Sequence, residues 1–330
     1  MSVRKWTIGA VSAFAALAML FVATAATAQP AAGVKAAAIT DIGGLGDKGF
    51  NDLCKKGLDD AKKKLGATGR VFISKSAADY IPNLSTAGRG GYNVAVTCGF
   101  LLGADTLKAA KRFPKTKFAT IDYGYGSKGA KNLRGLIFAE QEAGYLAGVA
   151  AAFASKTNNV SFVGGQAVPA VVHFRAGYIA GAKATKKGIK VQAGYSQSFT
   201  DQAKCKEMAL NQFAAGSDVV FAAAGSCGIG ALQAAKEQKK WGIGVDNDQS
   251  FLGSYILTSA VKRLDLAVYK TISDVKDGKF VAGDSLFNIK NGGVGYGKIS
   301  PSFAKAVQLK AKLTAVSKLI ASGKIKPPTK

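Results

Sequence analysis

The sequence is poor in histidine, cysteine, proline and acidic residues. Its 330 residues include one His, four Cys, seven Pro and 20 Asp+Glu against 45 Lys+Arg, which gives a formal net charge of +25. One His and four Cys without a C-x-x-C pair exclude His-rich or Cys-rich metal sites and a dense disulfide scaffold. The 48% hydrophobic content excludes a disordered chain. At roughly 150 residues per domain, the length predicts two domains, each able to bury a core.

The N-terminus has the pattern of a secretory signal peptide. Arg4 and Lys5 precede an uncharged stretch over 6–29, and Ala26-Thr-Ala28 matches an A-x-A cleavage site. We expect cleavage after Ala28; the alternative is an uncleaved membrane anchor. No Cys precedes Cys54, so we expect no lipid attachment at the cleavage site and a free periplasmic protein with a net charge of +23.

Export changes how the charge and the cysteines are interpreted. A strongly basic chain suggests a protein that binds nucleic acid. An exported protein, however, meets little nucleic acid, and the basic residues here form no stripe with interleaved aromatic residues. They occur in short clusters such as Lys62–Lys64 and Lys186–Lys187, which are typical of solvated helix faces. In an oxidising compartment the four Cys predict two disulfides.

Hydrophobic periodicity predicts strands alternating with helices, and hence βαβ units with mainly parallel sheets. The expected strands are 34–41, 71–74, 94–97, 118–122, 160–163, 189–193, 219–223 and 242–246. The expected helices are 50–65, 104–112, 140–154, 171–185, 202–215 and 230–238.

An internal repeat divides the chain into two similar halves. The segments 94–103, 107–111 and 118–122 recur at an offset of 125 residues as 219–228, 232–236 and, with a one-residue gap, 243–246. Each copy is predicted to form, in this order, a strand, a glycine-containing loop, a helix and a strand that ends in Asp. Two α/β lobes would form a cleft, with the carboxyl ends of their strands facing a ligand.

The cysteines follow the same division. We predict the disulfides Cys54–Cys98 and Cys205–Cys227, each joining a helix start to a strand end in one half. Free buried thiols are the alternative.

Two kinds of enzyme site receive little support. Gly44-Leu-Gly-Asp-Lys-Gly49 matches a dinucleotide-binding loop, but no acidic residue ends the second strand to bind a ribose. His173 is the single His and no G-x-S-x-G elbow is present, so a surface or capping role for His173 is preferred over catalysis. We expect neither metal nor cofactor.

Polar and aromatic residues at the predicted loops suggest binding. Asp41 ends the first strand, Asp47, Phe50 and Asn51 follow it, and Asp246 ends a strand of the second half. Carboxylates can accept paired hydroxyl hydrogens and aromatic rings can sandwich a flat ring. Local roles stay open, because Asn51 could serve the helix start and Phe50 could pack as a staple.

These motifs resemble the basic membrane protein family of ABC-transporter substrate-binding proteins, whose best-known members are purine nucleoside receptors. The resemblance spans about 34–300 and is carried by the segments 47–51, 96–100, 117–122, 140–148, 162–165, 168–178, 242–249 and 258–262.

The resemblance implies a type I periplasmic-binding-protein fold with two Rossmann-like lobes and a hinge of three strands. It implies an N-terminal lobe over 29–137 plus about 263–297, a C-terminal lobe over 138–262 and a helical tail over 298–330. It also implies ligand contacts, which are Asp41, Asp47, Phe50 and Asn51 from the first lobe and Phe221, Gly225, Asp246 and Lys262 from the second. Phe50 and Phe221 would stack on the ligand, and Asp246 would bind ribose hydroxyls.

We therefore expect a monomeric periplasmic receptor for a small flat polar ligand, most simply a purine nucleoside or base. Its partners would be an ABC permease and ATPase, with no role for nucleic acid. The alternatives are an exported hydrolase acting on nucleosides or sugars, using Asp41, Asp47 or Asp246, and a receptor that feeds a sensor.

Overall fold

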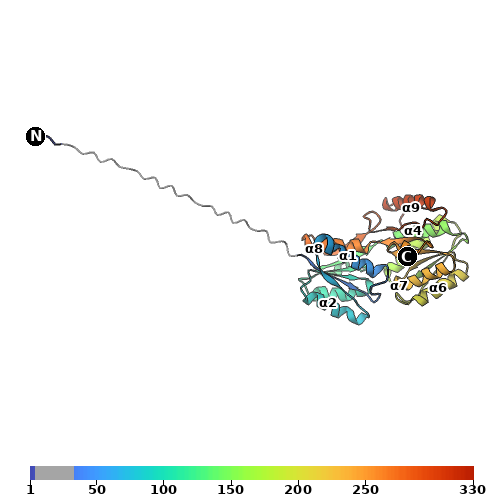
Figure 1. The fold of residues 1–330 in the computed structure, drawn as a ribbon, viewed down its shortest axis with the longest axis horizontal. Helices are drawn as coiled ribbons and strands as arrows, with labels where there is room; N and C mark the ends of the chain where they lie inside the picture. The colour runs from blue at the N-terminus through green and yellow to red at the C-terminus, as the bar shows by residue number, and fades with distance from the viewer. Residues whose placement is uncertain (4–32) are drawn as a thin grey trace. The chain divides into compact units, whose positions relative to one another are not determined.

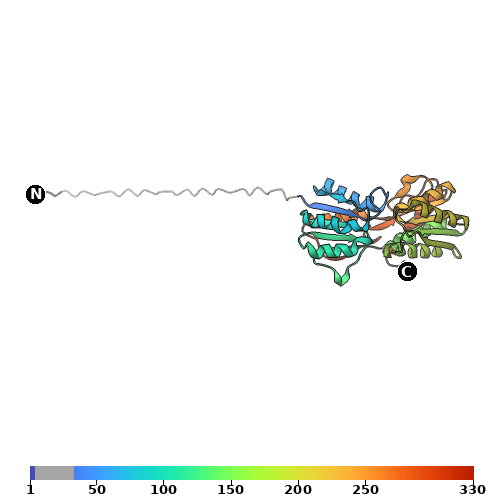
Figure 2. The ribbon, with the colours of Figure 1, turned by 90° about the horizontal axis from the view of Figure 1, so that it is seen from below.

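A computed structural model describes residues 1–3 and 33–330. The predicted signal peptide from residue 4 onward, with its cleavage site, lies outside the described residues. Residues 33–330 form one compact unit made of two α/β lobes that lie side by side (Figures 1 and 2).

Lobe one is built on a six-stranded parallel sheet with the order β11-β5-β4-β3-β1-β2. Its strands are β1 (Lys35–Thr40), β2 (Thr68–Phe72), β3 (Val94–Cys98), β4 (Lys117–Ile121), β5 (Leu133–Phe138) and β11 (Gly283–Phe287). Its helices are α1 (Phe50–Leu65), α2 (Tyr80–Arg89), α3 (Gly103–Arg112) and α8 (Leu264–Lys276). Helices α1 and α8 cover one face of the sheet and α2 lies over the other (Figure 1).

Lobe two repeats this plan with the order β12-β10-β9-β8-β6-β7. Its strands are β6 (Asn159–Gly164), β7 (Lys190–Tyr195), β8 (Val219–Ala223), β9 (Trp241–Asp246), β10 (Ile256–Lys262) and the antiparallel β12 (Val294–Tyr296). Its helices are α4 (Glu140–Ala154), α5 (Pro169–Thr185), α6 (Gln202–Ala214), α7 (Gly225–Glu237) and α9 (Ala306–Ala321). Helix α4 lies on one face of the sheet beneath α9, and α6 and α7 lie on the other (Figure 1).

The predicted fold class, two α/β lobes with mainly parallel sheets, is confirmed. The central strands are buried along their whole length, which explains their continuous apolar runs. The 125-residue repeat also holds, because Val94–Cys98 and Val219–Ala223 form equivalent central strands β3 and β8.

The chain crosses between the lobes three times, after β5, β10 and β11. One expected boundary differs in the structure. Residues 294–296 were expected in the N-terminal lobe, but they form β12, which pairs with β10 of lobe two through Ala260 and Tyr296. A three-residue strand is too short to leave a periodic signal in the sequence.

Candidate functional site

A pocket lies where the carboxyl ends of both sheets meet. Its empty space, counted together with the open solvent at its mouth, is about 650 Å³. Lobe one contributes Asp41, Gly43, Asp47, Phe50, Asn51, Gly99, Phe100, Leu101 and Asp122. Lobe two contributes Val168, Ala170, Val171, Phe174, Phe199, Ala223, Gly225, Ser226, Val245, Asp246 and Lys262. Four carboxylates and one ammonium line the pocket, so it is acidic inside a strongly basic protein.

The segment between β1 and α1 carries a buried polar network. Asp41 Oδ1 accepts hydrogen bonds from Asn51 Nδ2 (2.8 Å) and from the Gly43 amide (2.9 Å). Burial raises the pKa of Asp41 to about 6, although these two hydrogen bonds favour the ionised form. This network fixes the side chain of Asn51 at the pocket wall.

Asp47 organises the start of α1 rather than presenting free oxygens. Its carboxylate accepts four hydrogen bonds, from the amides of Gly49, Asn51 and Asp52 and from Asn51 Nδ2. Asp47 therefore acts as a helix cap and holds Phe50 and Asn51 in place. Burial raises its pKa above the ordinary value.

The glycine-rich loop does not form a phosphate site. The amides of Gly46 and Lys48 donate to the carboxylate of Asp52, at 2.8 and 3.0 Å. An internal anion thus occupies donors that a dinucleotide would need, and this geometry also disfavours a dinucleotide cofactor at the loop.

Gly99 allows the lobe-one wall to close around Phe50. Its φ is +121°, and a Cβ at this position would lie 3.0 Å from Asp41 Oδ2 and 3.3 Å from Phe50 Cε1. A side chain here would have a strained backbone and would crowd two pocket residues.

Among the described residues, Lys262 is the one cation that lines the pocket, and it links the lobes. It ends β10 of lobe two and is 1% exposed, and its Nζ lies 2.6 Å from Asp122 of lobe one and 2.9 Å from Glu140. The same Nζ lies 5.5 Å from the ring centroid of Phe50 and 5.9 Å from that of Phe174. Aromatic rings from both lobes therefore flank one buried ammonium.

Burial and mutual repulsion shift the acidic groups around Lys262. Burial raises the pKa of Asp122 to about 6 and that of Asp246 to about 7, because the nearby Lys262 offsets only part of the desolvation. Burial alone would raise the pKa of Glu140, but Lys262 and His173 hold it below its ordinary value. The pKa of Lys262 is raised, because its acidic neighbours outweigh burial.

Asp122 and Asp246 are equivalent positions of the internal repeat. Asp122 directly follows β4 and Asp246 ends β9, and both have left-handed backbones with φ of 67° and 62°. This conformation, which Asp tolerates better than most residues, turns both carboxylates toward the pocket. Asp122 is paired with Lys262, whereas no side-chain hydrogen bond within the described residues involves Asp246. Asp246 is therefore available to a ligand.

The predicted stacking role of Phe221 is wrong. Phe221 lies in the middle of β8 with no exposed surface, and its ring packs against Phe162, Phe174 and Tyr178 at centroid distances of 5.5, 5.8 and 5.4 Å. The strand ends two residues later at Ala223, which does line the pocket. Phe221 supports Phe174 from behind.

The aromatic wall of lobe two consists of Phe174 and Phe199, which the sequence patterns did not identify. Phe174 lies on α5 and Phe199 in the loop between β7 and α6. No motif at either position distinguishes a pocket residue from a core residue.

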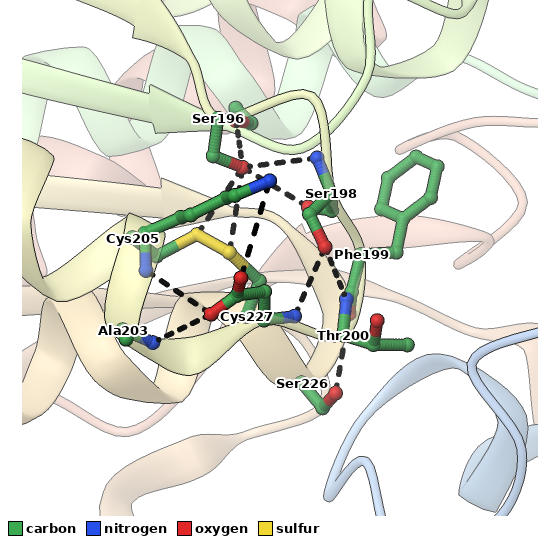
Figure 3. Close-up of a disulfide and its surroundings, with 11 residues drawn as sticks. Ser196, Ser198, Phe199, Thr200, Ala203, Cys205, Ser226 and Cys227 are labelled. Carbon is green, nitrogen blue, oxygen red and sulfur yellow. Dashed lines mark hydrogen bonds and ion pairs between the residues drawn. A yellow bond between two sulfur atoms is a disulfide. The ribbon is translucent and has the colours of Figure 1, made fainter.

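A disulfide lies directly beneath the Phe199 loop. Cys205 of α6 and Cys227 of α7 are joined, and Ser196 Oγ lies 3.4 and 3.3 Å from their sulfur atoms (Figure 3). The Phe199 carbonyl accepts hydrogen bonds from the Cys227 amide (3.0 Å) and Ser226 Oγ (3.1 Å). The Phe199 ring projects away from the disulfide (Figure 3).

Gly225 belongs to this arrangement. Its φ is +56°, and a Cβ there would lie 3.1 Å from the Phe199 carbonyl oxygen. The position thus needs glycine for the close approach of the loop backbone, in addition to any approach of a ligand.

The second disulfide, Cys54–Cys98, occupies the related position in lobe one. Cys54 lies one turn after Phe50 on α1, and Cys98 precedes Gly99 at the end of β3. Both predicted pairings are thus present. Cys54–Cys98 joins two segments that line the pocket, whereas Cys205–Cys227 joins α7, which lines the pocket through Gly225 and Ser226, to α6 behind the Phe199 loop.

His173 has a structural position. Its Nδ1 lies 3.3 Å from Oε2 of Glu140, whose Oε1 lies 2.9 Å from Lys262 Nζ. Over residues 1–3 and 33–330, no group of His, Cys, Asp and Glu side chains is arranged to hold a metal ion.

Seven of the eight predicted ligand contacts line this one pocket: Asp41, Asp47, Phe50, Asn51, Gly225, Asp246 and Lys262. Asp122 was missed as a site residue, although its position in the internal repeat, equivalent to Asp246, could have identified it.

Comparison with known proteins identifies the family. The family model for Bmp, an ABC transporter substrate-binding protein that is PnrA-like, matches residues 34–328. The chain belongs to the Bmp family. It is 38% identical over 323 residues to the ABC transporter nucleoside-binding protein BmpA of Lactococcus lactis, covering 90% of each chain. It is also 34% identical to basic membrane protein D of Borreliella burgdorferi, covering 77% of this chain and 76% of that protein.

Solved structures agree with this assignment. A solute-binding protein of an ABC transporter system from Aeropyrum pernix superposes with a TM-score of 0.81 at 26% identity, covering 90% of this chain and 94% of that one. The fold is thus that of the type I periplasmic binding proteins. Substrate-binding proteins of this family act outside the cytoplasmic membrane. Across the described part of the chain, no helix has the length and apolar character required to cross a bilayer.

Proposed function

We propose that the protein is the exported receptor of an ABC importer and binds a purine nucleoside or base between its lobes. The observation that carries the proposal is the combination in one pocket of aromatic rings from both lobes with the unpaired carboxylate of Asp246. Rings on two sides suit a flat heterocycle, and the carboxylate suits the paired hydroxyls of a ribose. The relative from Lactococcus lactis, named a nucleoside-binding protein, supports the same ligand class.

The charge of the pocket restricts the ligand further. Four carboxylates and one ammonium would repel a phosphate group in a site of low dielectric constant. The proposed ligand is therefore a nucleoside or base and not a nucleotide. No bond is broken; the closed complex delivers the ligand unchanged to a permease and its ATPase.

The proposal is tested by mass spectrometry of small molecules released from the denatured protein, followed by titration calorimetry. Adenosine, guanosine or inosine should bind, and adenosine monophosphate should bind at least about 100-fold more weakly. Phe50→Ala should weaken nucleoside binding at least about tenfold, since stacking on an aromatic ring contributes roughly 1–3 kcal/mol. Phe280→Ala, which removes a ring packed on Arg134 away from the pocket, is the control.

Binding of sugars alone would contradict the proposed ligand class. Equal nucleoside affinity without the Phe50 ring would contradict the assigned binding site. Chromatography after long incubation separates a receptor from a hydrolase, because a receptor leaves the glycosidic bond intact.

We also propose that the mature protein begins after Ala28 and is a monomer in the periplasm. N-terminal sequencing of the exported protein and light scattering test these points.

A further inference from the structure

The acidic residues are distributed very unevenly along the chain. All 20 lie within 41–142 and 201–284. The segment 143–200 has six basic residues and no acidic one, and 285–330 has nine lysines and no acidic one. These two acid-free segments are far apart in sequence.

The fold brings the two segments together on one side of lobe two. Segment 143–200 contains nearly all of α4 and the whole of α5, and segment 285–330 contains α9. Both α5 and α9 pack on the buried helix α4, and Figure 1 shows α9 directly over α4. Phe303, just before α9, contacts Phe153 near the end of α4 at a centroid distance of 6.2 Å.

The exposed lysines form two groups, which we call the cationic surface. Lys156, Lys183 and Lys187 lie after or near the ends of α4 and α5, at the end of lobe two opposite the pocket. Lys305, Lys310 and Lys318 lie along α9. Within the described residues none of the six forms a salt bridge.

On other surfaces of the protein, exposed lysines are paired with acidic side chains. On α1, Lys55 and Lys56 pair with Asp59 and Asp60. On the opposite face of lobe two, Lys206 of α6 pairs with Glu237 of α7 at 2.8 Å. The high net charge is therefore concentrated where acidic side chains are missing, and it is not spread evenly.

We propose that the cationic surface docks the receptor on the anionic phospholipid surface of the membrane that holds its permease. Lysines near an anionic bilayer each contribute about a fivefold gain in binding. Helix α9 also exposes two apolar side chains, Val307 (80% exposed) and Leu319 (38% exposed), near its lysines. Nucleic acid fits less well, because no aromatic ring is exposed on the described parts of these two segments for stacking.

Docking through this surface leaves the ligand site free. Lys156, Lys183 and Lys187 lie at the amino ends of the lobe-two strands, and the pocket lies at the carboxyl ends. The receptor can thus stay at the membrane while its pocket remains open to solvent and to the permease.

The test measures binding of the exported protein to vesicles by flotation. Vesicles of 30% phosphatidylglycerol in phosphatidylcholine should bind the protein at least about tenfold better than phosphatidylcholine alone, and 0.5 M NaCl should abolish the difference. The variant K305Q/K310Q/K318Q should bind the anionic vesicles at least about tenfold more weakly. The control K63Q/K108Q/K111Q removes the same charge from exposed lysines of lobe one and should lose less than about threefold.

Nucleoside affinity should stay unchanged in both variants, so this test is separate from that of the proposed function. Three results would overturn the proposal: equal binding to both vesicle types, equal losses in the two triple variants, or tighter binding to RNA than to the anionic vesicles.

Discussion

The two lobes share a plan but present their pocket residues differently. Lobe one positions Asn51 and Phe50 through the carboxylates of Asp41 and Asp47, which are hydrogen-bonded at the start of α1. Lobe two presents Phe199 from a loop. The Phe199 carbonyl accepts hydrogen bonds from Ser226 and from the amide of Cys227, which is part of a disulfide. One wall is held by a helix and its cap, and the other depends on a cross-link between two helices. Single substitutions should therefore have different consequences in the two lobes.

The largest loss of stability is expected from a substitution at Lys262, where the two lobes meet. Lys262→Met would leave Asp122, Glu140 and Asp246 buried without their cation, and breaking such a pair costs about 3–5 kcal/mol. The melting temperature should fall by roughly 10 °C at pH 8. The loss should be smaller at pH 5, where Asp122 and Asp246 become protonated. Calorimetric scans at both pH values test this; an equal loss at both would contradict it.

Within lobe two, substitution of Phe221 should lower the stability of the protein, whereas substitution of Phe199 should lower its affinity for nucleoside. Phe221→Ala empties a core position among three aromatic rings and should reduce the free energy of unfolding by about 3 kcal/mol. Phe199→Ala should leave stability nearly unchanged and weaken nucleoside binding at least about tenfold. Denaturant titration and calorimetry on both variants measure the two quantities, and the reverse pattern would restore Phe221 as the stacking residue.

Asp246→Asn should weaken binding yet stabilise the unliganded protein. The pKa of Asp246 is about 7 in the folded state against an ordinary 3.8, so the folded state binds the proton more tightly. Its contribution to stability is therefore lost as pH rises from about 4 to 7. The variant should melt a few degrees above the wild type at pH 8, with little difference at pH 4, and bind nucleoside at least about tenfold more weakly. A variant that melts below the wild type at pH 8 would contradict the raised pKa of Asp246.

Removing one disulfide should affect nucleoside affinity more than removing the other, but this difference should be smaller than the effects above. Cys205→Ala/Cys227→Ala should weaken nucleoside binding severalfold, because it loosens the Phe199 loop and the Gly225–Ser226 turn. Cys54→Ala/Cys98→Ala should change affinity less, since the cap by Asp47 still holds α1. Calorimetry below the melting temperature of each variant compares them. Equal losses would remove the distinction between the two walls.

Much of the fold was predictable, because buried parallel strands and amphipathic helices leave strong periodic signals. Helix α1 and strand β8 were predicted with their observed bounds. Strand β5 was missed since Arg134 interrupts its apolar run, and helix α2 since Pro82 and Gly88 weaken its pattern. Assigning β11 to lobe one depends on pairing with β5 over a long sequence separation, which local periodicity does not encode.

The site was less predictable for a similar reason. Residues next to strand ends, such as Asp41 and Asp246, could be identified because parallel strands bring their carboxyl ends together. Phe221 was misplaced because a two-residue difference along β8 separates a pocket residue from a core residue. Phe199 lies on a loop whose position depends on contacts with α7, so the sequence around it carries no comparable signal.

The path of the chain through the lobes has a consequence for folding during export. Lobe one lacks α8 and β11 until about residue 287 has crossed the membrane, and lobe two lacks β12 and α9 until residue 321. A chain delivered from its N-terminus therefore cannot complete either sheet early, because edge strands of both arrive last. Such non-local pairing slows folding, so neither sheet can be completed before most of the chain has been delivered.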